Sequence, residues 1–144
     1  MTIRKVKIKE APIIARIAAN CSPSMRPSVE GTYEYLARCF SNTFFVYEKD
    51  DEIIGFIVGF PNTAELGEFW IYQCGILNKW RGKGIGSELF TAIFDAVKAE
   101  GYKSIRSHYK FSNTHSANLH KKFGMEICGQ DERGYFVEII FNND

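Results

Sequence analysis

A glycine-rich loop between a predicted strand and the most regular predicted helix constrains the fold of this chain more than any other feature. The loop covers residues 81–87 and reads Arg-Gly-Lys-Gly-Ile-Gly-Ser. An apolar run ends at Leu77 before it, and apolar residues recur after it at helical spacing from residue 84 to 100. The first turn of a helix leaves backbone N–H groups without partners at the positive end of the helix dipole. This order of elements therefore predicts an anion-binding site.

The residues of the loop indicate which anion it binds. Gly82, Gly84 and Gly86 have no Cβ, so the backbone can wrap around a phosphate, and Arg81 and Lys83 add positive charge. A Walker loop needs a lysine followed by Ser or Thr after its last glycine, and a dinucleotide fingerprint needs G-x-G-x-x-G in the opening unit of a parallel sheet. The loop meets neither requirement. A plain connection between a strand and a helix would need only one or two glycines, so we predict a diphosphate ligand.

The rest of the chain reads as a single domain over residues 1–144. The predicted strands span residues 2–9, 43–48, 52–60, 67–77, 103–109, 125–128 and 135–141. The predicted helices span residues 11–20, 29–40, 84–100 and 113–123, and Ser28 is expected to cap the second of them. A hydrophobic share of 45% supplies one core without disulfides or a metal.

Charge and cysteine usage exclude several classes of protein. The formal net charge is +1 with interspersed signs, and the basic residues between Arg4 and Lys9 alternate with apolar ones, which is typical of the solvated face of a strand. Cys74 and Cys128 lie in apolar runs, where buried thiols are expected. The chain has no apolar run near the ~20 residues that span a bilayer. We expect a cytoplasmic protein with reduced thiols, without a metal, and without nucleic acid or membrane as partner.

Two motifs make the chain resemble a known family. Arg81, Gly84 and Gly86 match [QR]-x-x-G-x-[GA] at the start of a long helix, and residues 113–125 match N-x-x-[AS]-x-x-[LF]-[YH]-x-x-x-G-[FM]. With the order of predicted elements, both motifs resemble those of the GNAT superfamily of acyl-CoA-dependent N-acetyltransferases. The resemblance implies an α/β (α+β) acyl-CoA N-acyltransferase fold with about four helices. Its sheet of about seven strands is mixed and mostly antiparallel, with a parallel, splayed central pair, here residues 67–77 and 103–109.

The resemblance also implies how acetyl-CoA, the co-substrate, is held. The pyrophosphate would lie against the loop, and the pantetheine arm would run along the strand that ends at Ile76 and Leu77. A bulge at Gly75 would part the two strands. Asn113 and Ser116 of the second motif would also contact the co-substrate. The loop residues in this set are Arg81, Gly82, Lys83, Gly84, Ile85, Gly86 and Ser87.

For the reaction, the resemblance implies direct attack of a neutral amine on the thioester. A backbone N–H near Ile76 would stabilise the oxyanion. His120 stands where the family usually has the tyrosine that protonates the departing thiolate, and it is the predicted acid. A packing role for this histidine is the alternative.

The base is less evident, because Trp70 and Tyr72 occupy the positions where relatives carry one. Strand alternation places Glu68 on the same face as these residues and turns Gln73 the other way. We expect Glu68, or a water ordered by Tyr72, to take the proton of the amine. Glu68 as a solvated residue at the start of the strand is the alternative.

The acceptor pocket of this family is built largely by the first two helices and their loop, here residues 21–40. Its polar candidates include Arg26 and Tyr33, together with Glu30, Tyr35 and Arg38, and Tyr72 is expected to contribute from the sheet. Residues 33–60, with Tyr72 and Gln73, resemble diaminobutyrate acetyltransferases. We predict the primary amine of a small metabolite as acceptor. A protein N-terminus or lysine, or a non-catalytic acyl-CoA-binding module, is the alternative, and exposed C-terminal strand edges make a homodimer possible.

Overall fold

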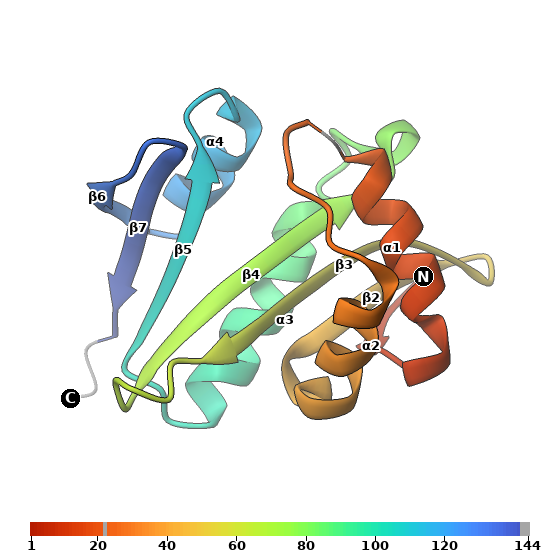
Figure 1. Cartoon of the computed structure of the whole chain (residues 1–144), viewed down its shortest axis with the longest axis horizontal. Helices are drawn as coiled ribbons and strands as arrows, with labels where there is room; N and C mark the ends of the chain where they lie inside the picture. Colours follow the sequence, from red (N-terminus) through yellow and green to blue (C-terminus); the bar gives the residue numbers. More distant parts are fainter. Residues whose placement is uncertain (22, 142–144) are drawn as a thin grey trace.

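The computed structural model describes residues 1–21 and 23–141, and over these residues it contains one seven-stranded sheet and four α-helices (Figure 1). Three short 3₁₀ turns, Ile8–Glu10, Ser41–Thr43 and Asn78–Trp80, connect them. The elements in chain order are β1 (Thr2–Lys5), α1 (Ala11–Asn20), α2 (Glu30–Cys39), β2 (Phe44–Lys49), β3 (Glu52–Pro61), β4 (Glu68–Ile76), α3 (Ile85–Ala99), β5 (Ser104–Lys110), α4 (Thr114–Lys122), β6 (Glu126–Gln130) and β7 (Gly134–Ile140).

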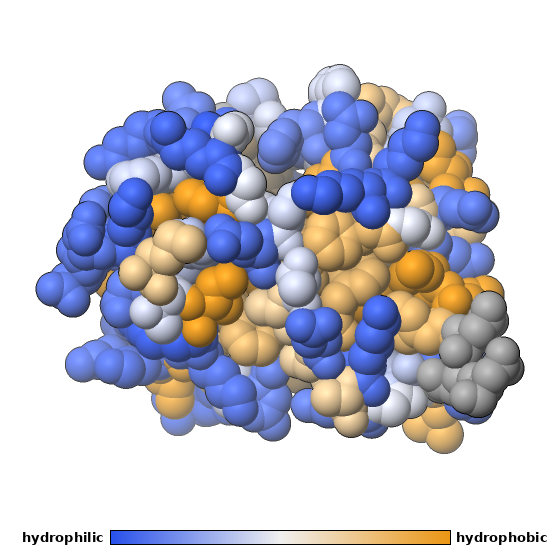
Figure 2. Space-filling view, turned by 180° about the vertical axis from the view of Figure 1, so that it is seen from behind, coloured by the Kyte–Doolittle hydropathy of each residue, from blue (hydrophilic) through white to orange (hydrophobic). Residues whose placement is uncertain are grey.

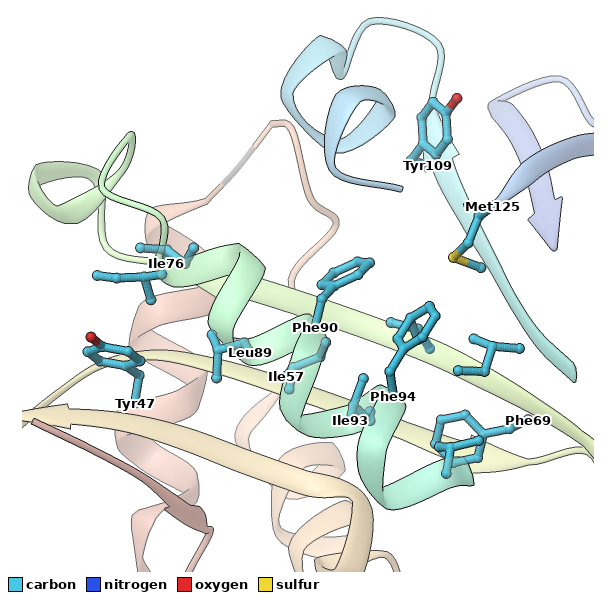
Figure 3. Packing of buried hydrophobic residues seen from close by; sticks show 14 of the residues in the cluster. Tyr47, Ile57, Phe69, Ile76, Leu89, Phe90, Ile93, Phe94, Tyr109 and Met125 are labelled. Atoms are coloured by element: carbon cyan, nitrogen blue, oxygen red, sulfur yellow. The ribbon is translucent and has the colours of Figure 1, made fainter. Parts of the chain in front are cut away.

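The sheet has the order β1-β2-β3-β4-β5-β7-β6, and β4 and β5 are its parallel neighbours. Helices α1 and α2 cover one face, and α3 covers the other (Figure 1). The predicted apolar stripe of α3 is buried against the sheet, as Figure 3 shows for Leu89, Phe90, Ile93 and Phe94. The predicted mixed fold with a parallel central pair is therefore confirmed.

The strands β4 and β5 diverge after a short paired stretch. Among the described residues they pair only at Glu68–Ser104, Phe69–Ile105 and Trp70–Arg106, and a V-shaped opening follows (Figure 1). From behind, the molecule shows a notch in its upper surface at this opening, rimmed by hydrophilic residues (Figure 2). The free edge of β4 beyond Trp70 is thus available to a ligand.

The bulge in β4 lies at Tyr72 and not at Gly75, so that prediction was wrong. Val58 of β3 pairs with Gln73 and Gly59 pairs with Ile71, which leaves Tyr72 as the extra residue. Gly75 is needed for another reason, because a Cβ there would lie 2.7 Å from the Phe56 ring.

Several smaller predictions were also wrong. The first strand ends at Lys5, because the Glu10 carboxylate accepts hydrogen bonds from the Lys7 N–H at 2.7 Å and from Arg4 at 2.9 and 2.7 Å and folds the chain into a 3₁₀ turn. Ser28 does not cap α2, since the cap position is Val29. Cys128 is exposed. In the described part of the chain, no helix is long and apolar enough to cross a bilayer.

Candidate functional site

A cavity of about 830 Å³ lies where β4 and β5 separate. One part of its wall comes from the end of β4 and the loop before α3, through Ile76 and Arg81. Other parts come from the loop between α1 and α2, from the rest of β4, from β5, from α4 and from the turn between β6 and β7, with single residues from β3, α3 and β7. Residue 22 of the first loop lies outside the described residues. The predicted co-substrate and acceptor regions therefore open into one space.

The glycine loop has the geometry of an anion site. Gly82 and Gly84 have φ of +76° and +84°, in the left-handed region, and a Cβ on either would meet nothing within 4 Å. Gly84 is the N-terminal cap residue of α3 and makes no side-chain cap hydrogen bond, so the first N–H groups of the helix are left without a cap. Gly86 packs α3 closely against α4, because a Cβ there would lie 3.2 Å from Leu119. The exposed Lys83 lies beside these free N–H groups.

The end of β4 presents backbone groups to the cavity. The Leu77 N–H donates to the Ile54 carbonyl at 2.9 Å, so Leu77 serves the pairing with β3. Alternation then turns the N–H and C=O of Ile76 away from β3. The Ile76 carbonyl accepts from the Arg81 Nε at 3.2 Å, while the Ile76 N–H faces the open side of β4.

The second motif shapes the start of α4. The Asn113 Oδ1 accepts from the Ser116 N–H at 3.0 Å and caps the helix. The Asn113 Nδ2 donates to the Ser24 carbonyl at 3.3 Å, which ties α4 to the loop between α1 and α2. Asn113 and Ser116 both line the cavity.

His120 also lines the cavity, but it is only 4% exposed. Its Nδ1 lies 2.7 Å from the Ser116 carbonyl, which can only accept, so Nδ1 carries the hydrogen. Its Nε2 then accepts from the Ser107 hydroxyl at 2.8 Å. Burial lowers the pKa of the imidazole, and the hydrogen bond to Ser116 offsets this only in part. A buried ring with both nitrogens engaged favours the alternative, a packing role, over the predicted role of His120 as the acid.

Glu68, the predicted base, is not among the residues that line the cavity. It lies at the paired end of β4 and β5, where its Oε1 accepts from Trp70 Nε1 at 2.6 Å and from Asn62 at 3.1 Å. Its Oε2 lies 3.4 Å from the Arg106 Nε. Burial raises the pKa of this carboxyl, but the two hydrogen bonds and the Arg106 charge outweigh burial and lower it.

Of the predicted acceptor residues, Arg26 and Tyr72 line the cavity and Tyr33 does not. Tyr33 is fully buried behind the wall, where its hydroxyl donates to Gln73 Oε1 at 2.7 Å and accepts from the Ser28 N–H at 3.1 Å. The Tyr72 hydroxyl lies 2.6 Å from the Ser28 Oγ. The bulge at Tyr72 reverses the alternation of β4, and Gln73 therefore lines the cavity instead of pointing away.

Several cavity residues were missed in the sequence, above all His108 and Asp131. The His108 Nε2 lies 2.9 Å from the Asp131 Oδ1, and this hydrogen bond, followed by one from the Arg133 N–H, lowers the pKa of Asp131 to about 2. An ionised carboxylate only accepts, so Nε2 carries a hydrogen, and in the neutral imidazole the lone pair is then on Nδ1. Among the described residues this Nδ1 has no hydrogen-bond partner. A polar turn, residues 131–134, between two strands was the available signal.

Within residues 1–21 and 23–141, no three His, Cys, Asp or Glu side chains come together in a way that could hold a metal ion. The fold and the site together define the class of the protein. A mixed sheet whose parallel pair diverges around a cavity, with an anion-binding loop opening the helix between the two strands, is the N-acyltransferase fold. The chain belongs to the GNAT acetyltransferase family, whose model matches residues 13–125.

Curated relatives include L-2,4-diaminobutyric acid acetyltransferases. The protein from Marinococcus halophilus is 27% identical over 100 residues, which cover 68% of this chain and 58% of that protein. The protein from Wolinella succinogenes is 28% identical over 125 residues, which cover 85% of this chain and 72% of that protein. The chain thus spans less than two thirds of the length of the first of these relatives.

Solved structures share the whole fold. The diaminobutyrate acetyltransferase EctA from Paenibacillus lautus, in complex with L-2,4-diaminobutyric acid and coenzyme A, has a TM-score of 0.88 at 17% identity, over 99% of this chain and 97% of that one. Ard1 from Thermoplasma volcanium has a TM-score of 0.87 at 23% identity, over 99% and 98%. At these identities the likeness concerns the fold.

Proposed function

We propose that the protein transfers an acetyl group from acetyl-CoA to a primary amine of a small amino acid. The observation that carries this proposal is the continuity of one cavity along the free edge of β4. Its wall contains Arg81 beside the anion loop and, elsewhere, the imidazole of His108. A donor and an acceptor bound at these two places would meet between β4 and β5.

The residues present fit acetyl-CoA as donor. A pyrophosphate fits the backbone of Gly82 and Gly84, which have left-handed conformations, and the free N–H groups up to Ser87. The positive charges of Arg81 and Lys83 are nearby. The unpaired edge of β4 up to Ile76 suits the amide groups of a pantetheine arm, as an added strand would. In this arrangement the Ile76 N–H donates to the oxygen that becomes negative during attack.

His108 is the group that we propose as the base. Imidazole is the side chain most often used for this role, and the free Nδ1 of His108 can take the proton of the attacking amine while Asp131 holds the ring. The amine nitrogen bonds to the carbonyl carbon, the C–S bond breaks, and coenzyme A leaves as a thiolate that takes a proton from solvent. His120 then acts as a positioning residue that fixes the Ser107 hydroxyl in the cavity wall.

Support for a small amino acid comes from the relatives, which are named for L-2,4-diaminobutyric acid. The loop between α1 and α2 is also anchored by Gln73, whose Nε2 donates to the Arg26 carbonyl at 2.8 Å. This loop forms part of the cavity wall at the acceptor end, where it would contact a bound amino acid.

The test is release of free thiol from acetyl-CoA in the presence of single amines. The panel contains L-2,4-diaminobutyrate, L-lysine, methionine sulfoximine and a peptide with a free N-terminus. We expect turnover with a small amino acid and little with the peptide. Turnover with the peptide alone would contradict the proposed acceptor. A protein that binds coenzyme A but acetylates no amine would be a non-catalytic module.

We also propose a cytoplasmic location and a homodimer. A cytoplasmic location is supported by four free cysteines among the described residues. A homodimer is supported by Ile127 of β6 and Ile140 of β7, which are 58% and 65% exposed. Fractionation and light scattering would test them.

A further inference from the structure

The acceptor side of the cavity gathers three cations, and two of them make no ion pair among the described residues. Arg26 comes from the loop between α1 and α2, Lys110 from the end of β5, and Arg133 from the turn between β6 and β7, and all three line the cavity. We propose that these cations form a subsite for the carboxylate of the acceptor, so that the substrate is an amine that carries a free carboxylate. This inference rests on the proposed acetyltransferase function.

Hydrogen bonds bring the three cations to the same end of the cavity. The Lys110 ammonium donates to the Pro23 carbonyl, and Asn113 donates to Ser24, so the loop that carries Arg26 is fastened beside the end of β5. Lys110 pairs with Gly134, the residue after Arg133, across β5 and β7. Three segments far apart in the sequence thus place their cations around one opening.

The carboxylate that the cavity contains is already engaged. Asp131 is the one acidic residue in the wall among the described residues, and its Oδ1 accepts from His108, from the Arg133 N–H and from the Gly134 N–H, each at 2.9 Å. The Arg133 guanidinium is 4.0 Å from its Oδ2. Within residues 1–21 and 23–141, Arg26 and Lys110 make no ion pair.

Two carboxylates of the neighbouring strands β4 and β7 are committed elsewhere. Glu68 and Glu138 both pair with Arg106, which lies outside the cavity wall, at 3.4 and 3.0 Å. The cavity is also lined by the aromatic side chains of Phe60, Trp70 and Phe136. A concave wall of this kind strengthens the field of the cations, attracts an anion and repels a second ammonium group.

The chemistry of the acceptor follows from this excess of positive charge in the cavity wall. A diamine without a carboxylate would bring only positive charge to the subsite, and a peptide N-terminus would bring an amide where the anion belongs. An amino acid with a second amine brings a carboxylate for Arg26 and Lys110 and presents its other amine to His108. Arginine and lysine bind carboxylates through charge-assisted hydrogen bonds, which are about twice as strong as neutral ones.

The experiment compares acceptors that differ only in the carboxylate: L-2,4-diaminobutyrate against 1,3-diaminopropane, and L-lysine against 1,5-diaminopentane. For the wild type, kcat/KM should be at least about tenfold higher for the amino acid of the preferred pair. Arg26→Gln and Lys110→Gln should each lower kcat/KM for the amino acid about tenfold. In both variants, kcat/KM for the diamine should be unchanged or raised, and the KM for acetyl-CoA should be unchanged. The matched control is Arg16→Gln, because Arg16 is an exposed α1 residue outside the wall.

Binding provides a readout that does not depend on turnover. With coenzyme A present, the amino acid should raise the melting temperature of the wild type more than the diamine does, and Arg26→Gln should remove this difference. Equal kcat/KM values within both pairs, equal losses with both members in the variants, or no binding of either amino acid would overturn the carboxylate subsite. Acetylation of diamines alone would overturn it while leaving the acetyltransferase function intact. Coenzyme A binding without any acetylation would contradict the proposed function instead.

Discussion

At the residue scale, the environment of His120 decides its charge. Its edge faces Phe90, its ring stacks on Tyr109, and its two nitrogens are committed to Ser116 and Ser107. Protonation of Nε2 would place a charge in this buried position and break the hydrogen bond that Ser107 donates. The folded protein therefore favours the neutral ring, whereas the unfolded chain does not.

This difference predicts a loss of stability in mild acid. The pKa of His120 in the folded state is lowered below the ordinary value of 6.5, so the unfolded state takes up the proton first as the pH falls. The stabilising contribution is complete above about pH 6.5 and decreases as the pH falls toward the folded-state pKa. Urea unfolding at pH 8.0, 6.5 and 5.5 should show this decrease in the wild type and a smaller one in His120→Gln.

The control for this measurement is His115→Gln, because His115 is an exposed residue of the same helix. Its pH dependence should match that of the wild type. The carboxyls with lowered pKa, such as Glu10 and Glu68, lose their contributions at lower pH and do not confuse the comparison. If the free energy of unfolding depended on pH in the same way in the wild type and in His120→Gln, His120 would not be the group that titrates.

His108 gives a second prediction at this scale. Replacing it by Gln removes the proposed proton acceptor, and general-base catalysis contributes about 10² to 10⁴ in rate, so kcat/KM should fall about 100-fold or more. Asp131→Asn should lower it as well, because the ring loses the charged partner that fixes its tautomer. Glu132→Gln in the same turn, outside the cavity wall, is the matched control. Full activity of His108→Gln would assign the base elsewhere.

The residues whose local geometry the sequence indicates and those whose surroundings it does not indicate differ in a physical way. Arg81, Gly84 and Asn113 act through local geometry, at the start of a helix, and their spacing along the chain contains the necessary information. The base depends on which side chains a bulge turns inward. The extra residue at Tyr72 reverses the alternation of β4, so that Gln73 lines the cavity, and the Glu68 carboxylate is paired with Arg106 of β5. Neither the bulge nor this ion pair is indicated by residues that are close in the sequence.

At the element scale, the junction between β4 and α3 depends on the left-handed conformation of Gly84. An L-residue in this conformation costs roughly 1–2 kcal/mol, so Gly84→Ala should lower the free energy of unfolding by about 1 kcal/mol. A methyl group there would also stand between the backbone and the pyrophosphate, because the space beside Gly84 is open in the protein. We expect weaker binding of coenzyme A by calorimetry.

Gly31→Ala is the matched control for this element. Gly31 lies in α2, and a Cβ there would also meet nothing within 4 Å, but its φ is not positive. Alanine in a helix should stabilise the protein by about 0.5–1 kcal/mol without changing the affinity for coenzyme A. An unchanged affinity in Gly84→Ala would contradict the role of the loop.

At the scale of the whole molecule, the two halves of the sheet are joined by few bonds. The strands β5, β7 and β6 meet the remainder of the sheet through the three pairs between β4 and β5. Helix α4 adds aromatic contacts from Phe123 to Phe90 and Phe94, with centroids 5.3 and 5.1 Å apart. At the other end of β5, the Lys110 ammonium and the Asn113 amide donate hydrogen bonds to the carbonyls of residues 23 and 24, which connects this half of the sheet to the loop between α1 and α2.

This construction predicts that coenzyme A stabilises the entire protein. A ligand at 100 times its dissociation constant adds about 2.7 kcal/mol to the free energy of unfolding if it binds only the folded state. The gain should appear as a rise in melting temperature that grows with ligand concentration. Adenosine, which lacks the phosphates and the pantetheine arm, is the control and should give a much smaller rise.

Hydrogen exchange should locate the same effect on the free edge of β4. The N–H groups of Ile76 and Cys74 face away from β3 and lack a partner on β5, so they should exchange quickly without ligand. A pantetheine arm that adds to this edge should slow their exchange, whereas the Leu77 N–H, already bonded to Ile54, should change less. Protection confined to the glycine loop would mean that coenzyme A binds by its phosphates without entering the space between β4 and β5. In that case the thioester would not reach His108, and the proposed meeting point of donor and acceptor would be wrong.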